Sequence, residues 1–316
     1  MSAEVTAVGE ALIDIVIPFG HPESAAEHVG GSPTNVAIGL ARLGHATQMV
    51  THIGRDARGE MIAQLMSDNG VTLSPGSVGA ERTSTGTAQI DADGVATYDF
   101  DVTWDIEPGI AIASGHLHTG SIGAIVDPGG AKVLDLVRTA RAVSTVSYDP
   151  NSRPSLMGAV DEVRAKTEAF VAESDIVKAS DQDWAWLYPG TDPRAVLQAW
   201  AALGPLVVAL TRGPDDPLIL VAGTVHSVPA RRVDVVDTVG AGDSFMSGMI
   251  SGLLDAGLLG DAAARERLRQ ASWADIRPAI ERAVDAAAIT CSREGSNPPT
   301  RAELAASADS DPGLRP

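Results

Sequence analysis

The chain has 316 residues, of which 44% are hydrophobic and only 4% aromatic, so it can build one large core or two modest ones mainly from aliphatic side chains. Its 41 acidic residues outnumber the 23 basic ones and give a net charge of −18, which excludes nucleic acid and anionic membranes as expected partners. A single cysteine, Cys291, excludes a framework of disulfides within the chain.

The start of the chain does not resemble a targeting segment. Its first 17 residues include carboxylates at Glu4, Glu10 and Asp14 and no basic cluster, unlike a signal peptide. No apolar run in the sequence reaches the roughly 18 residues that a membrane-spanning helix needs. A cytoplasmic location, with no membrane partner, is therefore the simplest expectation.

Strand-like and helix-like patterns alternate along most of the chain. Short apolar runs predict strands, and apolar residues spaced three and four apart predict helices. The expected strands cover 3–8, 12–17, 48–53, 117–119, 143–148, 176–178, 207–211 and 218–221. The expected helices cover 33–43, 60–66, 132–142, 155–174, 192–203, 241–254 and 273–291. Repeated strand–helix units predict an α/β fold, a doubly wound and mostly parallel sheet with helices on both faces.

Residues 84–101 interrupt this alternation. Two short runs flank the turn sequence Asp91-Ala92-Asp93-Gly94, which predicts a β-hairpin. We expect the hairpin to stand out from the main body as a small lid, and an antiparallel edge of the main sheet is the alternative. Small polar residues near the end of the chain predict a disordered tail. The expected organisation is one domain over 1–304 with the lid inserted, followed by a tail over 305–316.

The most informative stretch is 237–243, which reads Asp-Thr-Val-Gly-Ala-Gly-Asp. Its two glycines let the backbone turn sharply, and the apolar spacing that follows predicts the start of a helix. The N–H groups at such a start favour an anion, because the helix dipole places about half a positive charge there. Asp243 beside this anion site either caps the helix or handles a proton next to a phosphate.

A second glycine pair precedes an earlier expected helix, in the segment Gly30-Gly31-Ser32-Pro33-Thr34-Asn35. Glycines at a helix start let a ligand approach the backbone closely. The amide of Asn35 can both donate to and accept from a sugar hydroxyl. Taken alone, however, such a pair is more often a simple tight turn than a binding site.

The two glycine segments together strongly resemble the two signatures of the ribokinase, or PfkB, family of carbohydrate kinases, and most of all its fructokinase members. The likeness covers nearly the whole chain. Other matching segments are Gly9-Glu10 with Asp14, Gly54-Arg55-Asp56 with Gly59, Asp149-Pro150-Asn151-Ser152-Arg153-Pro154, Thr211-Arg212-Gly213 and Arg293-Glu294-Gly295.

The resemblance implies a kinase that transfers the γ-phosphate of ATP to a sugar hydroxyl, with Asp243 as the general base. The backbone N–H groups of Gly240, Ala241 and Gly242 would hold the transferred oxygens. The implied sugar contacts are Asp14, Gly30, Gly31, Asn35 and Arg153. The implied nucleotide contacts are Lys178, Thr211, Gly213 and Gly295.

The resemblance also implies Mg²⁺ as a cofactor, and K⁺ as a further one in some relatives. Asp183 would hold Mg²⁺ through water, and Asp237 matches a monovalent-cation site. The chain departs from the common Asn-x-x-Glu pattern at Ser180-Asp181-Gln182-Asp183, a form also seen in fructokinase-like relatives. A second departure is at Asp215 and Asp216, where a glycine usually ends the nucleotide turn.

Fructose is the expected substrate, and ribose, 2-keto-3-deoxygluconate and a nucleoside are the alternatives. The Asp-Pro-Asn-Ser-Arg-Pro segment and the lid residues Tyr98, Phe100 and Trp104 favour fructose by resemblance. A sugar- or nucleotide-binding regulator without catalysis is a rival of another class. Lids of this family often pair across a dimer, so the resemblance also implies a homodimer through the lid.

Overall fold

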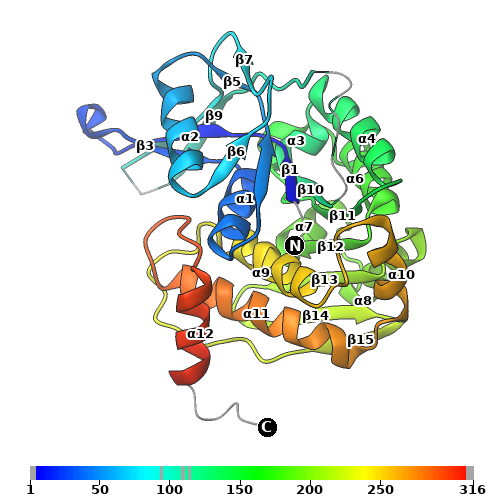
Figure 1. Cartoon of the computed structure of the whole chain (residues 1–316). Helices are drawn as coiled ribbons and strands as arrows, with labels where there is room; N and C mark the ends of the chain where they lie inside the picture. Colours follow the sequence, from blue (N-terminus) through cyan, green and yellow to red (C-terminus); the bar gives the residue numbers. More distant parts are fainter. Residues whose placement is uncertain (1–4, 93–94, 108–109, 111, 113–114, 311–316) are drawn as a thin grey trace.

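A nine-stranded sheet forms the centre of the structure (Figure 1). The computed structural model describes residues 5–92, 95–107, 110, 112 and 115–310. Neighbouring strands of this main sheet pair in parallel, except for two antiparallel pairs at one end. Its strand order is β15 (Thr224–Ser227), β14 (Asp215–Val221), β13 (Val207–Arg212), β12 (Ile176–Ser180), β11 (Thr145–Asp149), β10 (His116–Gly120), β1 (Val5–Val8), β4 (Thr47–Val50) and β6 (Val71–Leu73).

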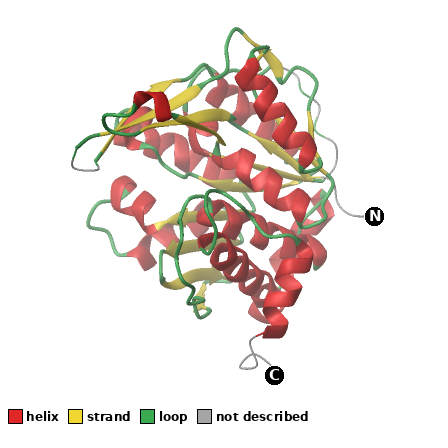
Figure 2. Cartoon of the chain, turned by 90° about the vertical axis from the view of Figure 1, so that its left-hand side faces the viewer, coloured by secondary structure: helices red, strands yellow, loops and turns green. Residues whose placement is uncertain are grey.

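Helices cover both faces of the main sheet, because successive side chains of a strand point to opposite sides (Figure 2). In β13, Val208 and Leu210 enter one core, whereas Val207 and Ala209 enter the other. The first face carries α3 (Ser121–Ile125), α4 (Gly129–Ala140), α6 (Val160–Glu173), α7 (Asp181–Leu187) and α8 (Pro193–Leu203). The second face carries α1 (Ser32–Arg42), α2 (Ala57–Asp68), α9 (Ala241–Asp255), α10 (Ala262–Gln270) and α11 (Trp273–Cys291). The predicted α/β fold is therefore confirmed.

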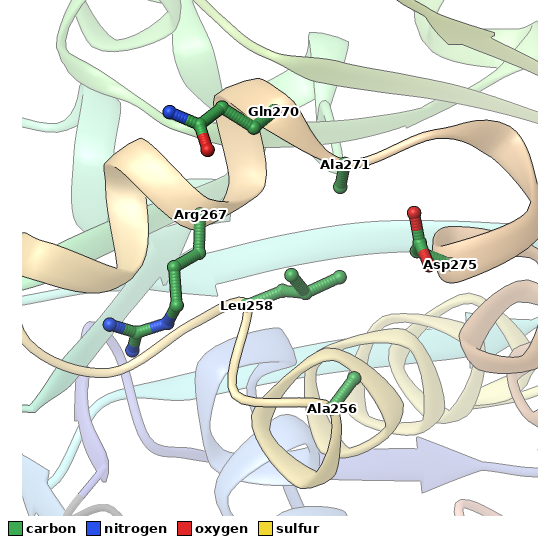
Figure 3. A pocket seen from close by; sticks show the side chains of 6 residues that line it. All are labelled: Ala256, Leu258, Arg267, Gln270, Ala271 and Asp275. Carbon is green, nitrogen blue, oxygen red and sulfur yellow. The ribbon is translucent and has the colours of Figure 1, made fainter.

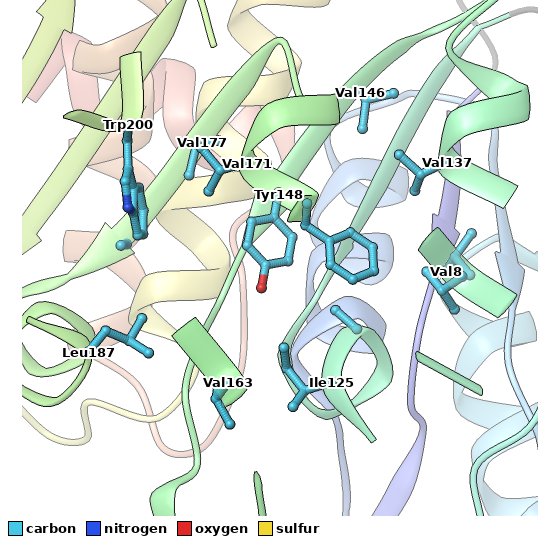
Figure 4. Packing of buried hydrophobic residues seen from close by; sticks show 14 of the residues in the cluster. Val8, Ile125, Val137, Val146, Tyr148, Val163, Val171, Val177, Leu187 and Trp200 are labelled. Carbon is cyan, nitrogen blue, oxygen red and sulfur yellow. The ribbon is translucent and has the colours of Figure 1, made fainter. Parts of the chain in front are cut away.

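Aromatic side chains anchor the helices of the first face, as Figure 4 shows around Tyr148 and Trp200. The Tyr148 ring stacks on Phe170 of α6 with 5.1 Å between ring centroids. Trp200 of α8 meets the edge of Trp184 of α7 at 5.6 Å. Such ring pairs add stabilisation beyond the burial of their area. The first pair packs α6 against β11, and the second joins α8 to α7, the helix that directly follows β12. The ends of β11 and β12 carry candidate site residues.

A second sheet of four strands contains the predicted hairpin. Its order is β3 (Ala26–Gly30), β2 (Leu12–Ile17), β8 (Thr85–Ile90) and β9 (Ala96–Asp101). The antiparallel pairing of β8 with β9 confirms the hairpin, and β8 pairs with β2 instead of with the main sheet. An edge of the main sheet is therefore the wrong alternative, while closure as a lid stays a prediction. Asp93 and Gly94 of the expected turn lie outside the described residues.

Several expected elements differ in extent from those observed. The expected strand over 48–53 divides into β4 and the short β5 (Ile53–Gly54), which pairs with β7 (Val78–Ala80). The expected helix over 155–174 divides into α5 (Pro154–Met157) and α6, because Gly158 takes a left-handed conformation with φ of 93°. The exposed strand β3 and a short 3-10 helix, η1 (Pro22–Ser24), were not expected from the sequence.

The predicted disordered tail is wrong for residues 305–310, because α12 (Arg301–Ser310) continues through them. The helix docks on the main body through an ion pair of 2.7 Å between Arg301 and Asp255 and through the buried Leu304. Residues 311–316 lie outside the described part of the chain. Within that part, none of the helices has the length and apolar character that crossing a membrane requires.

The strand order reverses beside β1, which lies between β4 and β10. Parallel strands end at the same edge of a sheet, and ligands of open α/β sheets bind outside these carboxyl ends, at such a reversal. Glu10 follows β1, Asp149 ends β11, and Lys178 lies near the end of β12. The fold therefore gathers these polar side chains where it is built to hold a ligand.

Candidate active site

Asp243 is the third residue of α9, and both of its carboxylate oxygens accept hydrogen bonds from α1. The hydroxyl of Ser32 donates to Oδ1 at 2.6 Å, and the amide nitrogen of Asn35 donates to Oδ2 at 2.8 Å. The side chain is buried, with 7% of its surface exposed. The structure thus joins the two predicted glycine segments at one carboxylate. These bonds from α1, rather than from the backbone of α9, disfavour a simple capping role.

A turn at Gly240 opens α9 and leaves room for an anion. Gly240 adopts a left-handed φ of 75°, and a side chain there would collide with Ser296. A Cβ atom at Gly242 would lie 2.9 Å from Nζ of Lys178, so the ammonium group faces the first turn of the helix. Of the N–H groups that open α9, that of Ala241 closes the turn by donating to the carbonyl of Thr238 at 3.2 Å, and that of Gly242 borders the same space as this cation. Such a space suits a phosphate.

Lys178 and Asp149 form a buried ion pair, with 2.8 Å between Nζ and Oδ2 and exposed fractions of 3% and 0%. Burial lowers the pKa of the Lys178 ammonium, but Asp149, Asp183 and Asp243 outweigh it and raise that pKa. Lys178 therefore keeps its charge. Burial raises the pKa of Asp149 to about 6, and Lys178 opposes this rise. Sequence reasoning gave Lys178 a role but left Asp149 without one.

Asp183 belongs to the capping box that starts α7. Its carboxylate accepts from the backbone of Ser152 at 2.6 Å and from the backbone and hydroxyl of Ser180 at 2.8 and 2.6 Å. A carboxylate offers about four lone-pair positions, so roughly one remains. This suits one bound water better than direct ligation of a metal. Within the described residues, no group of three or more His, Cys, Asp or Glu side chains could hold a metal ion.

Asp14 projects from β2 into room that two glycines leave. The strand register places it opposite His28 of β3 and Gly86 of β8. A Cβ atom at Gly30 would overlap Oδ2 of Asp14, and one at Gly86 would lie 3.2 Å from Oδ1. Surrounding protein atoms raise the pKa of Asp14, and the nearby charge of Arg153 opposes that rise. Asp14 and Arg153 therefore lie near each other, as the predicted sugar site requires.

The other predicted sugar residues have distinct local roles. A Cβ atom at Gly31 would overlap the carbonyl oxygen of Glu10, so this position admits only glycine without a shift. The guanidinium of Arg153 donates to the side chain of Asn151 at 2.9 Å. Asn151 has a φ of 34°, an unusual conformation for a residue with a side chain. Such outliers concentrate at functional sites, where the surrounding structure holds them in place.

The remaining predicted nucleotide residues come from the end of β13 and from two loops. Thr211, the last residue but one of β13, donates to the carbonyl of Ala179 at 3.4 Å, and Gly213 turns toward β14 with open space around it. Asp237 accepts from the backbone of Val239 at 3.0 Å and of Gly295 at 2.9 Å. These N–H donors lower the pKa of Asp237. Asp237, the predicted K⁺ ligand, therefore also joins the loop before α9 to the loop after α11.

Sequence reasoning missed Ser296, Ser32 and Glu10 as site residues. The hydroxyl of Ser296 is buried beside Gly240 and has no hydrogen-bond partner among the described residues. Ser32 and Glu10 stand within segments that the family resemblance covered, so their positions were noticed without a role. No pattern of spacing marks Ser296, because its place depends on how the loop after α11 folds back.

Two surface hollows lie away from these residues. One, of about 310 Å³, is lined by residues of α10, the start of α11 and the loop after α9 (Figure 3). Its polar groups are engaged locally, since Asp275 caps α11 and Arg267 donates to the carbonyl of Gly257 at 2.6 Å. The other, of about 340 Å³, lies between α8, β14 and the end of α10. The candidate site instead follows the edge of the main sheet.

Comparisons with known proteins identify the family of the chain. Residues 2–303 match the pfkB family of carbohydrate kinases. The chain is 33% identical over 256 residues to a fructokinase from Rhizobium leguminosarum bv. trifolii, which covers 78% of each protein. Its fold is similar to that of a fructokinase from Xylella fastidiosa with bound ATP, with a TM-score of 0.81, 22% identity and coverage of 98% and 100% of the two chains. A double-mutant fructokinase from Vibrio cholerae O395, in a form with fructose, ADP and potassium ion, gives a TM-score of 0.78 at 23% identity and coverage of 97% and 99%.

Proposed function

Because the chain belongs to the pfkB family of carbohydrate kinases, we propose that it transfers the γ-phosphate of ATP to fructose, with Asp243 as the general base. One observation carries the proposal. The buried carboxylate of Asp243 directly follows the Gly240 turn at the start of α9, where the N–H of Gly242 and the ammonium group of Lys178 suit a phosphate. Ser32 and Asn35 hold the same carboxylate from the side of the predicted sugar site. A base and an anion site are thus adjacent, which phosphoryl transfer to a hydroxyl requires.

Asp243 would accept the proton of the attacking sugar hydroxyl. The carboxylate is held in one orientation by its two hydrogen bonds, so little reorganisation is needed before reaction. A positioned general base contributes about 10²–10⁴ to a rate. The amide oxygen of Asn35 takes part in neither of these hydrogen bonds, so it could accept one from a sugar hydroxyl.

The turn and Lys178 would stabilise the transferred phosphoryl group. Its oxygens carry charge in the transition state, so fixed N–H donors and a nearby ammonium group favour it. Gly240 and Gly242 would supply the N–H groups, because the N–H of the predicted third donor, Ala241, donates to the carbonyl of Thr238. Lys178 would supply a charge that its pair with Asp149 keeps in place. The hydroxyl of Ser296 lies beside Gly240 without a partner in the described part of the chain, and it would donate to a phosphate oxygen.

Mg²⁺ bound with the nucleotide would offset the charge of the phosphates. The donor set fits such an ion only indirectly, because Asp183 keeps about one free lone-pair position and would hold it through water. Asp237 would supply one oxygen ligand to K⁺, since each of its oxygens accepts one N–H group. Titration with EDTA, and replacement of K⁺ by Na⁺, measure these two requirements separately.

Fructose is proposed from two lines of support. The Rhizobium relative is named a fructokinase, and the residues around Asp14 offer a carboxylate, Arg153 and His28 to a ligand with several hydroxyls. Asp14 would accept hydrogen bonds from sugar hydroxyls on the face that Gly30 and Gly86 leave open. The second sheet would close over the sugar and keep water from the phosphoryl group.

A panel of acceptors tests the proposal. ADP release is measured with fructose, ribose, 2-keto-3-deoxygluconate and a nucleoside, each with Asp243→Asn as the control for contaminating kinases. We expect kcat/KM for fructose to exceed that for every other acceptor by at least about tenfold. A higher value for another acceptor would overturn fructose and leave the kinase assignment standing. Thermal stabilisation by a sugar without any turnover would instead identify a binding regulator.

A further inference from the structure

Glu10 lies where the main sheet meets the second sheet. It stands between the end of β1 and the start of β2, and the chain returns from β3 to α1 at Gly31, against the carbonyl oxygen of Glu10. The hydroxyl of Thr34 donates to that same carbonyl at 3.0 Å. Both of these crossings between the sheets therefore meet at Glu10.

The carboxylate of Glu10 holds the starts of two helices. Its Oε2 accepts the N–H of Gly123 in α3 at 2.7 Å, and its Oε1 accepts the N–H of Ser32 in α1 at 3.4 Å. The side chain is 3% exposed. The indole of Trp104, which follows β9, donates to the carbonyl of Gly123 at 2.9 Å. Gly123 thus contacts the segment that precedes β2 and the segment that follows β9.

Ser32 connects this arrangement to Asp243. The backbone N–H of Ser32 donates to Glu10, while its hydroxyl donates to Oδ1 of Asp243 at 2.6 Å. Ser32 is itself buried, with 6% of its surface exposed. A change in the hydrogen bond to Glu10 would therefore move the donor that orients the carboxylate of Asp243.

The burial of Glu10 costs free energy, because a carboxylate loses its hydration there. Burial raises the pKa of its carboxyl to about 7, while the Ser121 hydroxyl, the backbone at Gly123 and the charge of Arg153 lower it. A buried carboxylate costs free energy that an apolar side chain would not. Ser121 also adopts a φ of 55°, an unusual conformation next to the carboxylate. Both features point to a role beyond packing.

We propose that Glu10 is a positioning residue. It fixes the segment between the two sheets to α1 and α3 and, through Ser32, orients the carboxylate of Asp243. The inference rests on the proposed role of Asp243 as the base. Glu10 touches neither the sugar nor the phosphates in this scheme. It acts on the rate because it holds Ser32 in place.

Glu10→Gln and Ser32→Ala, alone and together, test the proposal. Glutamine keeps an oxygen for Gly123 but turns an NH₂ group toward the N–H of Ser32. We expect kcat to fall about tenfold to a hundredfold in each single variant with KM for ATP within about twofold, because a small misplacement can cost about a hundredfold. The double variant should be no slower than the slower single one. Ser244→Ala is the matched control, since that hydroxyl bonds to Thr290 and not to Asp243.

Additive losses in the double variant, or an unchanged kcat in Glu10→Gln, would overturn the proposal. Hydrogen exchange gives a readout that needs no substrate. Exchange of the amides over 29–36 should quicken several-fold in Glu10→Gln and stay unchanged in Ser32→Ala, where the N–H keeps its partner. Unchanged exchange in Glu10→Gln contradicts the link to Ser32 even if the chain phosphorylates no sugar. If no acceptor is phosphorylated but amide exchange quickens in Glu10→Gln, only the proposed function is contradicted.

Discussion

Asn35 donates a hydrogen bond of 2.8 Å to Asp243, although 208 positions separate the two residues in the sequence. The bond joins α1, which follows β3 of the second sheet, to α9, which begins at the anion space. Asn35 was expected to bind the sugar, and the structure adds a second contact for its amide. The same residue can therefore affect both substrate binding and the orientation of the base.

Replacing Asp243 by Asn should abolish the base and preserve the fold. Asparagine keeps an oxygen that can accept from Ser32, so packing at the start of α9 is retained. We expect kcat to fall by at least about 10², with the Kd for ATP unchanged within about threefold. Turnover by ADP release and ATP binding by calorimetry check this. Near-normal turnover would remove Asp243 from the base role.

Replacing Asn35 by Asp should place two carboxylates within about 3 Å of each other. Like charges disfavour each other, so the pair would hold a proton to higher pH and the base would be protonated when it is needed. We expect kcat near pH 7 to fall by about 10² and to recover in part as the pH rises. The pH dependence of kcat measures this, and Asn35→Ala, which lacks the charge, should show no such recovery. An identical pH profile for both variants would contradict the expectation.

Replacing Lys178 by Met should lower both stability and the rate. The change leaves the carboxylate of Asp149 buried without its partner, which costs about 3–5 kcal/mol of unfolding free energy. The double variant Lys178→Met with Asp149→Leu should regain most of that stability but not the turnover, because the cation facing Gly242 is still missing. Denaturant unfolding and ADP release separate the two effects. Recovery of turnover in the double variant would show that Lys178 acts only in folding.

Glu10 should make the protein less stable as the pH rises. Its folded-state pKa of about 7 lies above the ordinary 4.5, so its contribution is fully present below pH 4.5 and is lost as the pH rises through about 7. The loss amounts to about 3 kcal/mol. Glu10→Gln cannot ionise, so its unfolding free energy should rise relative to that of the natural chain as the pH increases from 5 to 8. A difference in unfolding free energy that does not change with pH would contradict this.

Replacing Gly30 by Ala should weaken sugar binding selectively. The added methyl group would overlap Oδ2 of Asp14 and displace that carboxylate. We expect KM for the sugar to rise about tenfold or more, with KM for ATP unchanged within about twofold, since a displaced carboxylate loses its hydrogen bonds to the sugar. Gly79→Ala is the matched control, because its Cβ atom would lie 3.5 Å from the nearest atom. Equal rises in both KM values for Gly30→Ala would place Asp14 outside the sugar site.

The sequence was informative wherever local chemistry decides structure. Apolar spacing predicted α11 and most of α9 closely, because a helix of that length shows its period clearly. Glycines at 240 and 242 predicted the turn that opens α9, since a turn at the start of a helix depends on few residues. β3 escaped prediction because its residues are exposed and do not alternate, and its pairing with β2 comes from the distant chain.

Partners that belong to different elements were the part that the sequence could not supply. Nothing near Lys178 indicates that Asp149 is its counter-ion, because the pair forms only when β11 and β12 lie side by side. Likewise Ser32 is one serine among many until α9 brings Asp243 to it. The sequence thus predicted residues with a role more readily than residues that hold them.

The proposed catalytic and sugar-binding residues are divided between two sheets that are built from different strands. The base, the turn and Lys178 belong to the main sheet and its helices, whereas Asp14 and Gly86 belong to the second sheet. Substitutions in the second sheet can therefore alter which acceptor fits while the phosphoryl chemistry stays intact. During the evolution of such a fold, substitutions in a few strands of the second sheet can change the preferred acceptor. Acceptor specificity should therefore diverge faster than the phosphoryl transfer reaction.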